Sequence, residues 1–82
     1  MAEPYKAMLI DDDCGVHTLI KRILEDAGYS YCGAYGGEEG LEMLSTEHPD
    51  LLLLDVMMPG MNGFDVCKSI REKGRRIPVV FL

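Results

Sequence analysis

Short apolar segments bounded by polar residues recur along this chain. The first covers residues 7–10 (AMLI), and the second is a run of four leucines at 51–54. Such a run, without a polar position, favours a strand covered on both faces, as in a parallel sheet between two layers of helices. Residues 29–35 alternate loosely and contain Gly33, which suits a strand near a sheet edge. Residues 77–82 predict a fourth strand.

The segments between these strands have the spacing of helices. After the first strand, apolar residues recur every three or four positions over 16–27, which predicts a helix. Asp13 is expected to cap its beginning, and Gly28 stands where a C-terminal cap belongs. Two further helices are expected, over residues 38–46 and 64–74.

The resulting order is βαβαβαβ, which indicates an α/β fold. Parallel strands are joined by right-handed crossovers through helices, so the pattern predicts a doubly wound parallel sheet of four strands. With 82 residues, the chain makes at most one small domain. The sequence contains no repeat, linker or low-complexity tract.

Carboxylates follow two of the apolar runs. Asp11 and Asp12 come directly after the first run, and Asp55 comes directly after the four leucines. The carboxyl ends of parallel strands form the binding crevice of such sheets, so adjacent runs would bring these side chains together. Three carboxylates within a few ångströms repel one another unless a cation lies among them. The pattern therefore predicts a divalent-metal site that contains a reactive aspartate.

Composition narrows the functional classes. The net charge is −6 at pH 7, and the basic residues are spread out, so we expect no direct binding of nucleic acid or of an anionic membrane. Three cysteines without metal-type spacing are expected to be reduced. We expect no signal peptide or membrane span and a cytoplasmic location. His17, off the apolar stripe of its helix, and His48, before a proline, are both expected to be solvated.

The acidic residues and the loop after Asp55 resemble one family. Asp11 and Asp12 close the first strand, Asp55 closes the third, and residues 55–63 read DVMMPGMNG. This compound pattern is similar to the receiver domain of two-component response regulators, and the resemblance spans the whole chain. It implies a flavodoxin-like receiver fold with the strand order 2-1-3-4, which is taken from the family and not from the pattern.

The resemblance implies a role for each residue of this pattern. Asp55 would be the phosphoacceptor, taking a phosphoryl group from a sensor histidine kinase or a phosphotransfer protein. Asp12 would bind Mg²⁺ directly and Asp11 mainly through metal-bound water. Asp55 and the main-chain carbonyl of Met57 would complete the ligand set. The chain would be a phosphoprotein of signal transduction and not an enzyme, beyond catalysing its own phosphorylation and dephosphorylation.

The end of the chain departs from the family pattern. Complete receivers carry a Ser or Thr after the fourth strand and a Lys after the fifth, whereas this sequence ends at Leu82. We therefore expect residues 1–82 to be a receiver domain that lacks its C-terminal third. The fourth strand would be an exposed apolar edge, through which we expect a homodimer or a swapped oligomer.

Two other functions fit parts of the pattern. A phosphohydrolase of the haloacid-dehalogenase type would use Asp11 as nucleophile and Asp13 as acid, although Gly15 stands where that pattern has Thr or Val. A non-catalytic interaction or dimerisation module would keep the fold and bind partners without being phosphorylated. Labelling at Asp11 would favour the first alternative, and partner binding retained in an Asp55→Asn variant would favour the second.

Overall fold

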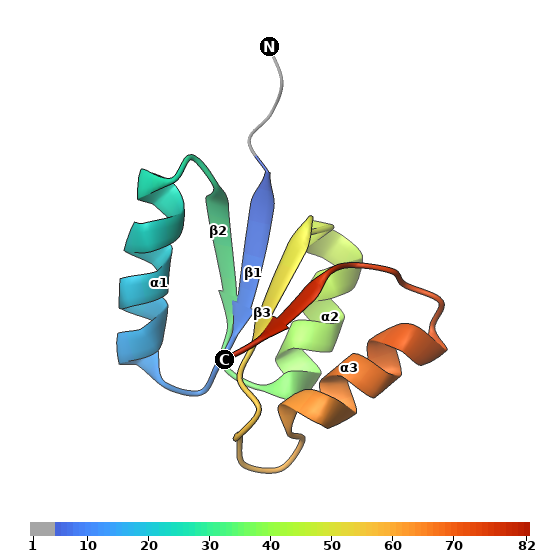
Figure 1. Cartoon of the computed structure of the whole chain (residues 1–82). Helices are drawn as coiled ribbons and strands as arrows, with labels where there is room; N and C mark the ends of the chain where they lie inside the picture. Colours follow the sequence, from blue (N-terminus) through green and yellow to red (C-terminus); the bar gives the residue numbers. More distant parts are fainter. Residues whose placement is uncertain (1–4) are drawn as a thin grey trace.

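The computed structural model describes residues 5–82, in which strands and helices alternate (Figure 1). The first four residues of the expected domain lie outside the described range. The elements are β1 (Lys6–Ile10), α1 (Cys14–Asp26), β2 (Ser30–Ala34), α2 (Gly37–Glu47), β3 (Leu51–Leu54), α3 (Gly63–Glu72) and β4 (Val79–Phe81). The predicted βαβαβαβ order is confirmed.

The strands form one parallel sheet in the order β2-β1-β3-β4. Lys6 at the start of β1 pairs with Ser30 of β2, and Ala7 pairs with Leu51 of β3. The strand order implied by the family resemblance is confirmed, and the segment with Gly33 is an edge strand as expected. Because β1 lies beside β3, the polar residues that follow these two strands become neighbours.

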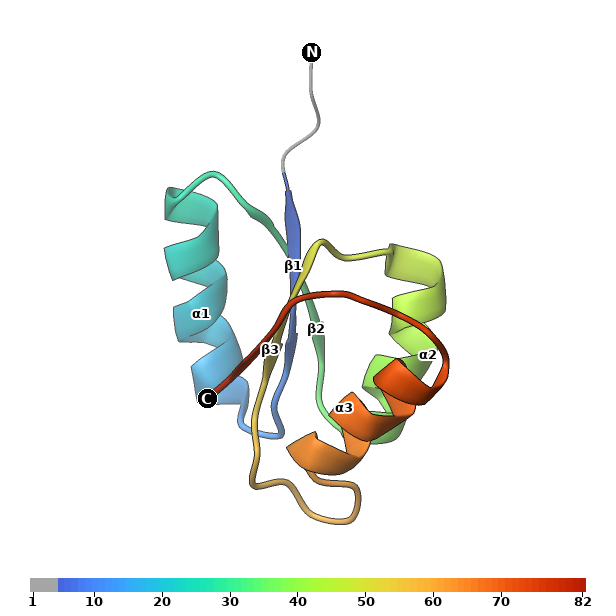
Figure 2. The ribbon, with the colours of Figure 1, turned by 45° about the vertical axis from the view of Figure 1, so that its right-hand side comes forward.

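Helices cover both faces of the sheet (Figure 2). α1 lies on one face, and α2 and α3 lie on the other. Residues 7–10 of β1 are fully buried between these layers, which explains the absence of a polar position in this run. The core on the side of α2 and α3 consists of Met8, Ile10, Ala34, Leu44, Leu52, Leu54, Met58, Val66 and Ile70.

β3 was expected to be buried on both faces, but only one of its faces is fully buried. Leu52 and Leu54 are buried, but Leu51 and Leu53 are only half-buried. Val80 of β4, which pairs with Leu53, is 47% exposed. The reason is that α1 packs against β1 and β2 and leaves the β3–β4 half of its face uncovered. The expectation that the fourth strand is an exposed apolar edge is confirmed.

Side chains cap the first turns of α1 and α3. Oδ1 of Asp13 accepts the N–H of Gly15 at 2.7 Å, so the expected capping role of Asp13 is confirmed. Asn62 forms a capping box with Asp65, in which each side chain accepts the main-chain N–H of the other residue, at 3.0 and 3.2 Å. Gly28, just after α1, has a φ of 90°, which favours glycine at a helix end.

α1 buries only part of the expected apolar stripe, and it also buries a histidine. His17 is only 3% exposed, whereas Leu19 is 60% exposed and Ile23 is also exposed. The expectation that His17 is solvated is wrong. Its ring nitrogens have polar partners in the main-chain oxygen of Asp11 and the hydroxyl of Tyr31, and a buried imidazole with both nitrogens satisfied is stable.

The second histidine and the three cysteines agree with the sequence-based expectations. His48 is exposed, as expected. Cys14, Cys32 and Cys67 are free, as expected, although Cys14 is exposed and does not pack in the core. Within residues 5–82, none of the helices is both long and apolar enough to cross a lipid bilayer.

Candidate metal centre

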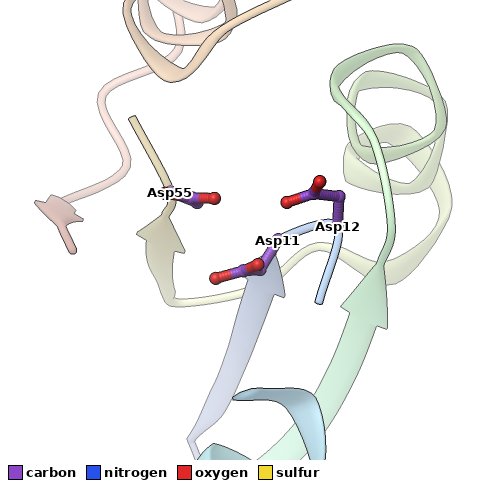
Figure 3. Close-up of side chains that lie close together, drawn as sticks. All are labelled: Asp11, Asp12 and Asp55. Atoms are coloured by element: carbon purple, nitrogen blue, oxygen red, sulfur yellow. The ribbon is translucent and has the colours of Figure 1, made fainter. Parts of the chain in front are cut away.

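Asp11, Asp12 and Asp55 meet at the carboxyl ends of β1 and β3. One carboxylate oxygen from each lies within 4.8 Å of the other two, and the side chains extend toward a common space (Figure 3). The N–H of Asp55 donates to the carbonyl of Ile10 at 2.9 Å, so the hydrogen bonds of the sheet themselves place Asp55 beside the end of β1. The structure thus brings together the three carboxylates that the sequence singled out.

The three carboxylates differ in exposure and in electrostatic environment. Asp11 is 5% exposed, Asp55 is half-buried and Asp12 is exposed. Burial raises the pKa of Asp11, and the charges of Asp55 and Asp12 raise it further. The N–H of Asp13, which donates to Oδ1 of Asp11 at 2.9 Å, opposes this rise. A cation among the three carboxylates would therefore stabilise the ionised form of Asp11.

The loop after β3 orients the carboxylate of Asp55. Its Oδ1 accepts the main-chain N–H of Met57 at 3.1 Å. The side chain of Met57 is exposed, so Met57 acts on Asp55 through its main chain alone. That its carbonyl is also a metal ligand stays a prediction.

Gly63 brings the start of α3 against the backbone of Asp55. Its N–H donates to the carbonyl of Val56 at 3.1 Å. A Cβ on Gly63 would overlap the main-chain carbonyl of Asp55, so a larger residue would displace either the helix or the end of β3. The sequence pattern assigned Gly63 only to a turn and to a family motif. The close approach of two backbones is the physical reason for a glycine here.

An open cleft adjoins the carboxylates. Its volume is about 600 Å³. The lining residues are Asp12, Val56, Met57, Met58, Pro59, Gly60, Asn62 and Phe64. A ligand can therefore reach the exposed carboxylate of Asp12 from the side of the loop.

The donor set fits a hard divalent cation such as Mg²⁺. The clustered side chains offer only carboxylate oxygens, and Mg²⁺ prefers oxygen ligands while keeping several water molecules. The exposure of Asp12 and the adjoining cleft leave room for that water. Neither a thiolate nor an imidazole belongs to the cluster within the described part of the chain, which disfavours zinc and copper.

Comparisons with known sequences identify relatives that match most of this chain. Residues 7–82 match the model of the response regulator receiver domain family. The chain is 40% identical over 77 residues to the alkaline phosphatase synthesis transcriptional regulatory protein PhoP of Bacillus subtilis. That alignment covers 94% of this chain and 32% of PhoP.

Solved structures show the same fold. The N-terminal domain of a response regulator receiver protein from Methanoculleus marisnigri superposes with a TM-score of 0.91 at 37% identity, over 94% of this chain and 64% of that chain. The response regulator TrrA from Thermotoga maritima, solved in complex with Mg²⁺-BeF, superposes with a TM-score of 0.81 at 35% identity, over 84% of this chain and 60% of that chain.

These relatives agree on the family, and they are longer than this chain. The chain spans about a third of the length of the curated relatives that it matches. The match supports a phosphoacceptor function and does not favour the haloacid-dehalogenase or the non-catalytic alternative. The chain belongs to the response regulator receiver domain family.

Proposed function

We propose that this chain is a phosphoacceptor of two-component signalling in which Asp55 takes a phosphoryl group from a phosphohistidine. The donor is a sensor histidine kinase or a phosphotransfer protein. The observation that carries the proposal is the meeting of three carboxylates within 4.8 Å at the ends of two adjacent parallel strands. Carboxylates form aspartyl phosphates, and such transfer depends on positioning and on neutralising charge.

The carboxylates have separate roles in this proposal. Asp55 is the nucleophile, with one oxygen held by the N–H of Met57 and the other free to attack phosphorus. The new O–P bond forms as the P–N bond breaks, and the imidazole leaves with the electron pair. Asp12 would hold Mg²⁺ directly and Asp11 mainly through water, while Asp55 and the Met57 carbonyl would complete the ligand set. When bound by these residues, Mg²⁺ would supply positive charge beside the phosphoryl oxygens.

The chain is also proposed to form one receiver domain, to act on no other molecule as an enzyme and to be located in the cytoplasm. We assign residues 1–82 to one receiver domain, which is supported by the family match over 7–82. The chain is not an enzyme in this proposal, because it acts only on its own phosphorylation. A cytoplasmic location is part of the same proposal. The net charge of −6 at pH 7 supports the absence of direct nucleic-acid binding.

We also propose that the chain self-associates through β4. This strand pairs with β3 on one side and lies at the edge of the described sheet. Val80, Phe81 and Leu82 are exposed, and an exposed apolar edge strand is a template for pairing with a second copy or for swapping. Sedimentation velocity over a range of concentrations is expected to show a dimer or larger species. A compact monomer at high concentration would rule this out.

Phosphorylation by a small phosphodonor tests the principal proposal. The protein is incubated with acetyl phosphate with and without Mg²⁺, trapped with borohydride, weighed by intact mass and mapped by peptide. We expect one adduct on Asp55 that requires Mg²⁺ and is absent from Asp55→Asn. Asp26→Asn, the same change at the opposite end of α1 from the site, is the matched control and should react like the wild type.

The location of the adduct separates the alternatives. An adduct on Asp11 would support the haloacid-dehalogenase chemistry instead. The absence of any adduct on a protein that still binds Mg²⁺ would overturn the phosphoacceptor proposal and favour the interaction module.

A further inference from the structure

We propose that His17 is a positioning residue of the metal centre, whose buried imidazole fixes the peptide bond that joins Asp11 to Asp12. This inference rests on the proposed function, since it concerns the affinity of the same carboxylates for Mg²⁺. It assigns a role to a residue that the family motif does not contain and that the sequence pattern placed in solvent.

The hydrogen bonds of the imidazole determine its tautomer. Nε2 lies 2.8 Å from the main-chain oxygen of Asp11, in a buried contact. A carbonyl can only accept, so Nε2 carries a proton and donates this bond, while Nδ1 lies within hydrogen-bond distance of the hydroxyl of Tyr31. Burial raises the pKa of Tyr31, so this hydroxyl keeps its proton. His17 therefore connects Tyr31 of the edge strand β2 to the Asp11–Asp12 peptide, which follows the end of β1.

The carbonyl that His17 holds lies between two of the proposed ligands. A trans peptide unit is planar, with its N–H directed opposite to its C=O, and residues 5–82 contain no cis peptide. The bond from His17 to the Asp11 carbonyl therefore also sets the direction of the Asp12 N–H. The Cα atoms of Asp11 and Asp12, which carry the two carboxylate side chains, lie at the two ends of this peptide plane. A rotation of the plane would move both carboxylates relative to Asp55.

The surroundings of His17 keep the ring in this orientation. The ring of Tyr35 lies against the imidazole, with the two centroids 4.1 Å apart. Gly33 of β2 leaves room for the contact between His17 and Tyr31. A Cβ at Gly33 would overlap the Tyr31 hydroxyl and crowd Nδ1 of His17. Within residues 5–82, no buried polar side-chain atom lacks a partner. A ring that is packed and fully bonded can transmit its position to the Asp11 carbonyl.

Mg²⁺ affinity, measured beside fold stability, tests this inference. Titration calorimetry gives the Kd, and urea unfolding gives the stability of each variant. His17→Leu keeps apolar volume but removes the donor, and we expect the Kd to rise by about 10- to 100-fold, the range seen when partners of metal ligands are lost. His17→Gln carries an amide nitrogen that can replace Nε2 and should recover most of the affinity.

A second buried residue of the same helix provides the stability control. Leu24 lies about two turns further along α1 and is buried. Leu24→Ala should lower the urea midpoint and leave the Kd for Mg²⁺ unchanged, because it leaves a cavity far from the carboxylates. A rise in Kd for Leu24→Ala equal to that for His17→Leu would show that any loss of stability weakens binding, and it would overturn the inference.

The remaining outcomes separate this inference from the proposed function. An unchanged Kd in His17→Leu would overturn the inference and leave the proposed function standing, whereas a wild type without saturable Mg²⁺ binding would overturn both. If His17→Leu does not fold, the imidazole nitrogen chemical shifts of the wild type decide. The Nε2–H tautomer is expected, and the Nδ1–H tautomer would contradict the bond to Asp11.

Discussion

The two ends of the parallel sheet carry acidic residues in opposite circumstances. At the amino end, the carboxylate of Asp50 accepts the N–H of Lys6 at 2.8 Å, and Glu47 forms an ion pair with the Lys6 ammonium at 3.3 Å. At the carboxyl end, the three carboxylates of the candidate metal centre face one another, and within residues 5–82 the structure gives none of them an ion pair. The chain thus supplies partners to the acidic side chains at one end, and no cationic partner to the carboxylates described at the other.

A cavity alone does not distinguish the two ends. The amino end also has a cleft, of about 310 Å³, lined by Leu44, His48, Pro49, Asp50, Arg75, Arg76 and Ile77. There, the guanidinium of Arg75 donates to the main-chain oxygen of Leu44 at 3.3 Å and joins α2 to the segment before β4. This cation holds two chain segments together. Unbalanced charge, rather than the presence of a hollow, is therefore the reason to assign the candidate metal site to the carboxyl end.

The stabilisation of the protein by Mg²⁺ should differ most between substitutions at the two ends of the sheet. A ligand at about 100 times its Kd that binds only the native state raises the free energy of unfolding by about 2.7 kcal/mol. For a chain of this size, that gain raises Tm by about 10 to 20 °C. Asp12→Asn should lose most of the gain, while Asp50→Asn at the amino end should keep it. Thermal unfolding with Mg²⁺ and with EDTA measures both, and equal gains in the two variants would contradict the assignment.

Removing one of the clustered carboxylates should have a smaller effect that depends on pH. Burial raises the pKa of Asp11 in the native state. Protonated Asp11 therefore favours the native state at acid pH. This contribution to the free energy of unfolding is lost as the pH rises through the raised pKa. Asp11→Asn should be more stable than the wild type in EDTA, by an amount that grows from about pH 4 to about pH 7. Urea unfolding over this range tests the sign, and a constant difference would refute it.

Breaking the ion pair at the amino end should have the smallest effect. Glu47→Gln should lower the free energy of unfolding by about 0.5 kcal/mol or less, because pairs at the surface are weak and are screened by salt. The side chains of Lys6 and Glu47 are 35% and 38% exposed. Urea unfolding at low and high salt measures the change. A loss of about 2 kcal/mol or more would show that this pair is much stronger than surface pairs are.

The sheet and the acidic cluster could be predicted because their signals are local. The apolar runs at 7–10 and 51–54 became β1 and β3, and each carboxylate that follows a run was carried to the same edge. Parallel pairing needs no knowledge of individual side-chain contacts. The order of the strands, by contrast, came from the family resemblance.

The buried face of α1 could not be predicted because the deciding contacts are distant in sequence. The burial of His17 depends on Tyr31, which is 14 residues away, and on a main-chain oxygen of β1. The exposure of Leu19 follows from α1 packing against β1 and β2 but not over β4. Helical spacing reports that an apolar stripe exists, and the tertiary structure decides how much of it is covered.

The bond between the N–H of Gly63 and the carbonyl of Val56 also makes the loop after Asp55 a practical attachment point. It fastens the base of the loop, whereas Pro59 and Gly60 at its tip are exposed. Doubling the length of a flexible loop costs only about 0.6 kcal/mol in closure entropy. A short peptide carrying a fluorophore could therefore be inserted between Pro59 and Gly60 to report whether a ligand is bound at the carboxylates. The hydrogen bond between Gly63 and Val56 would still hold the end of β3 in place.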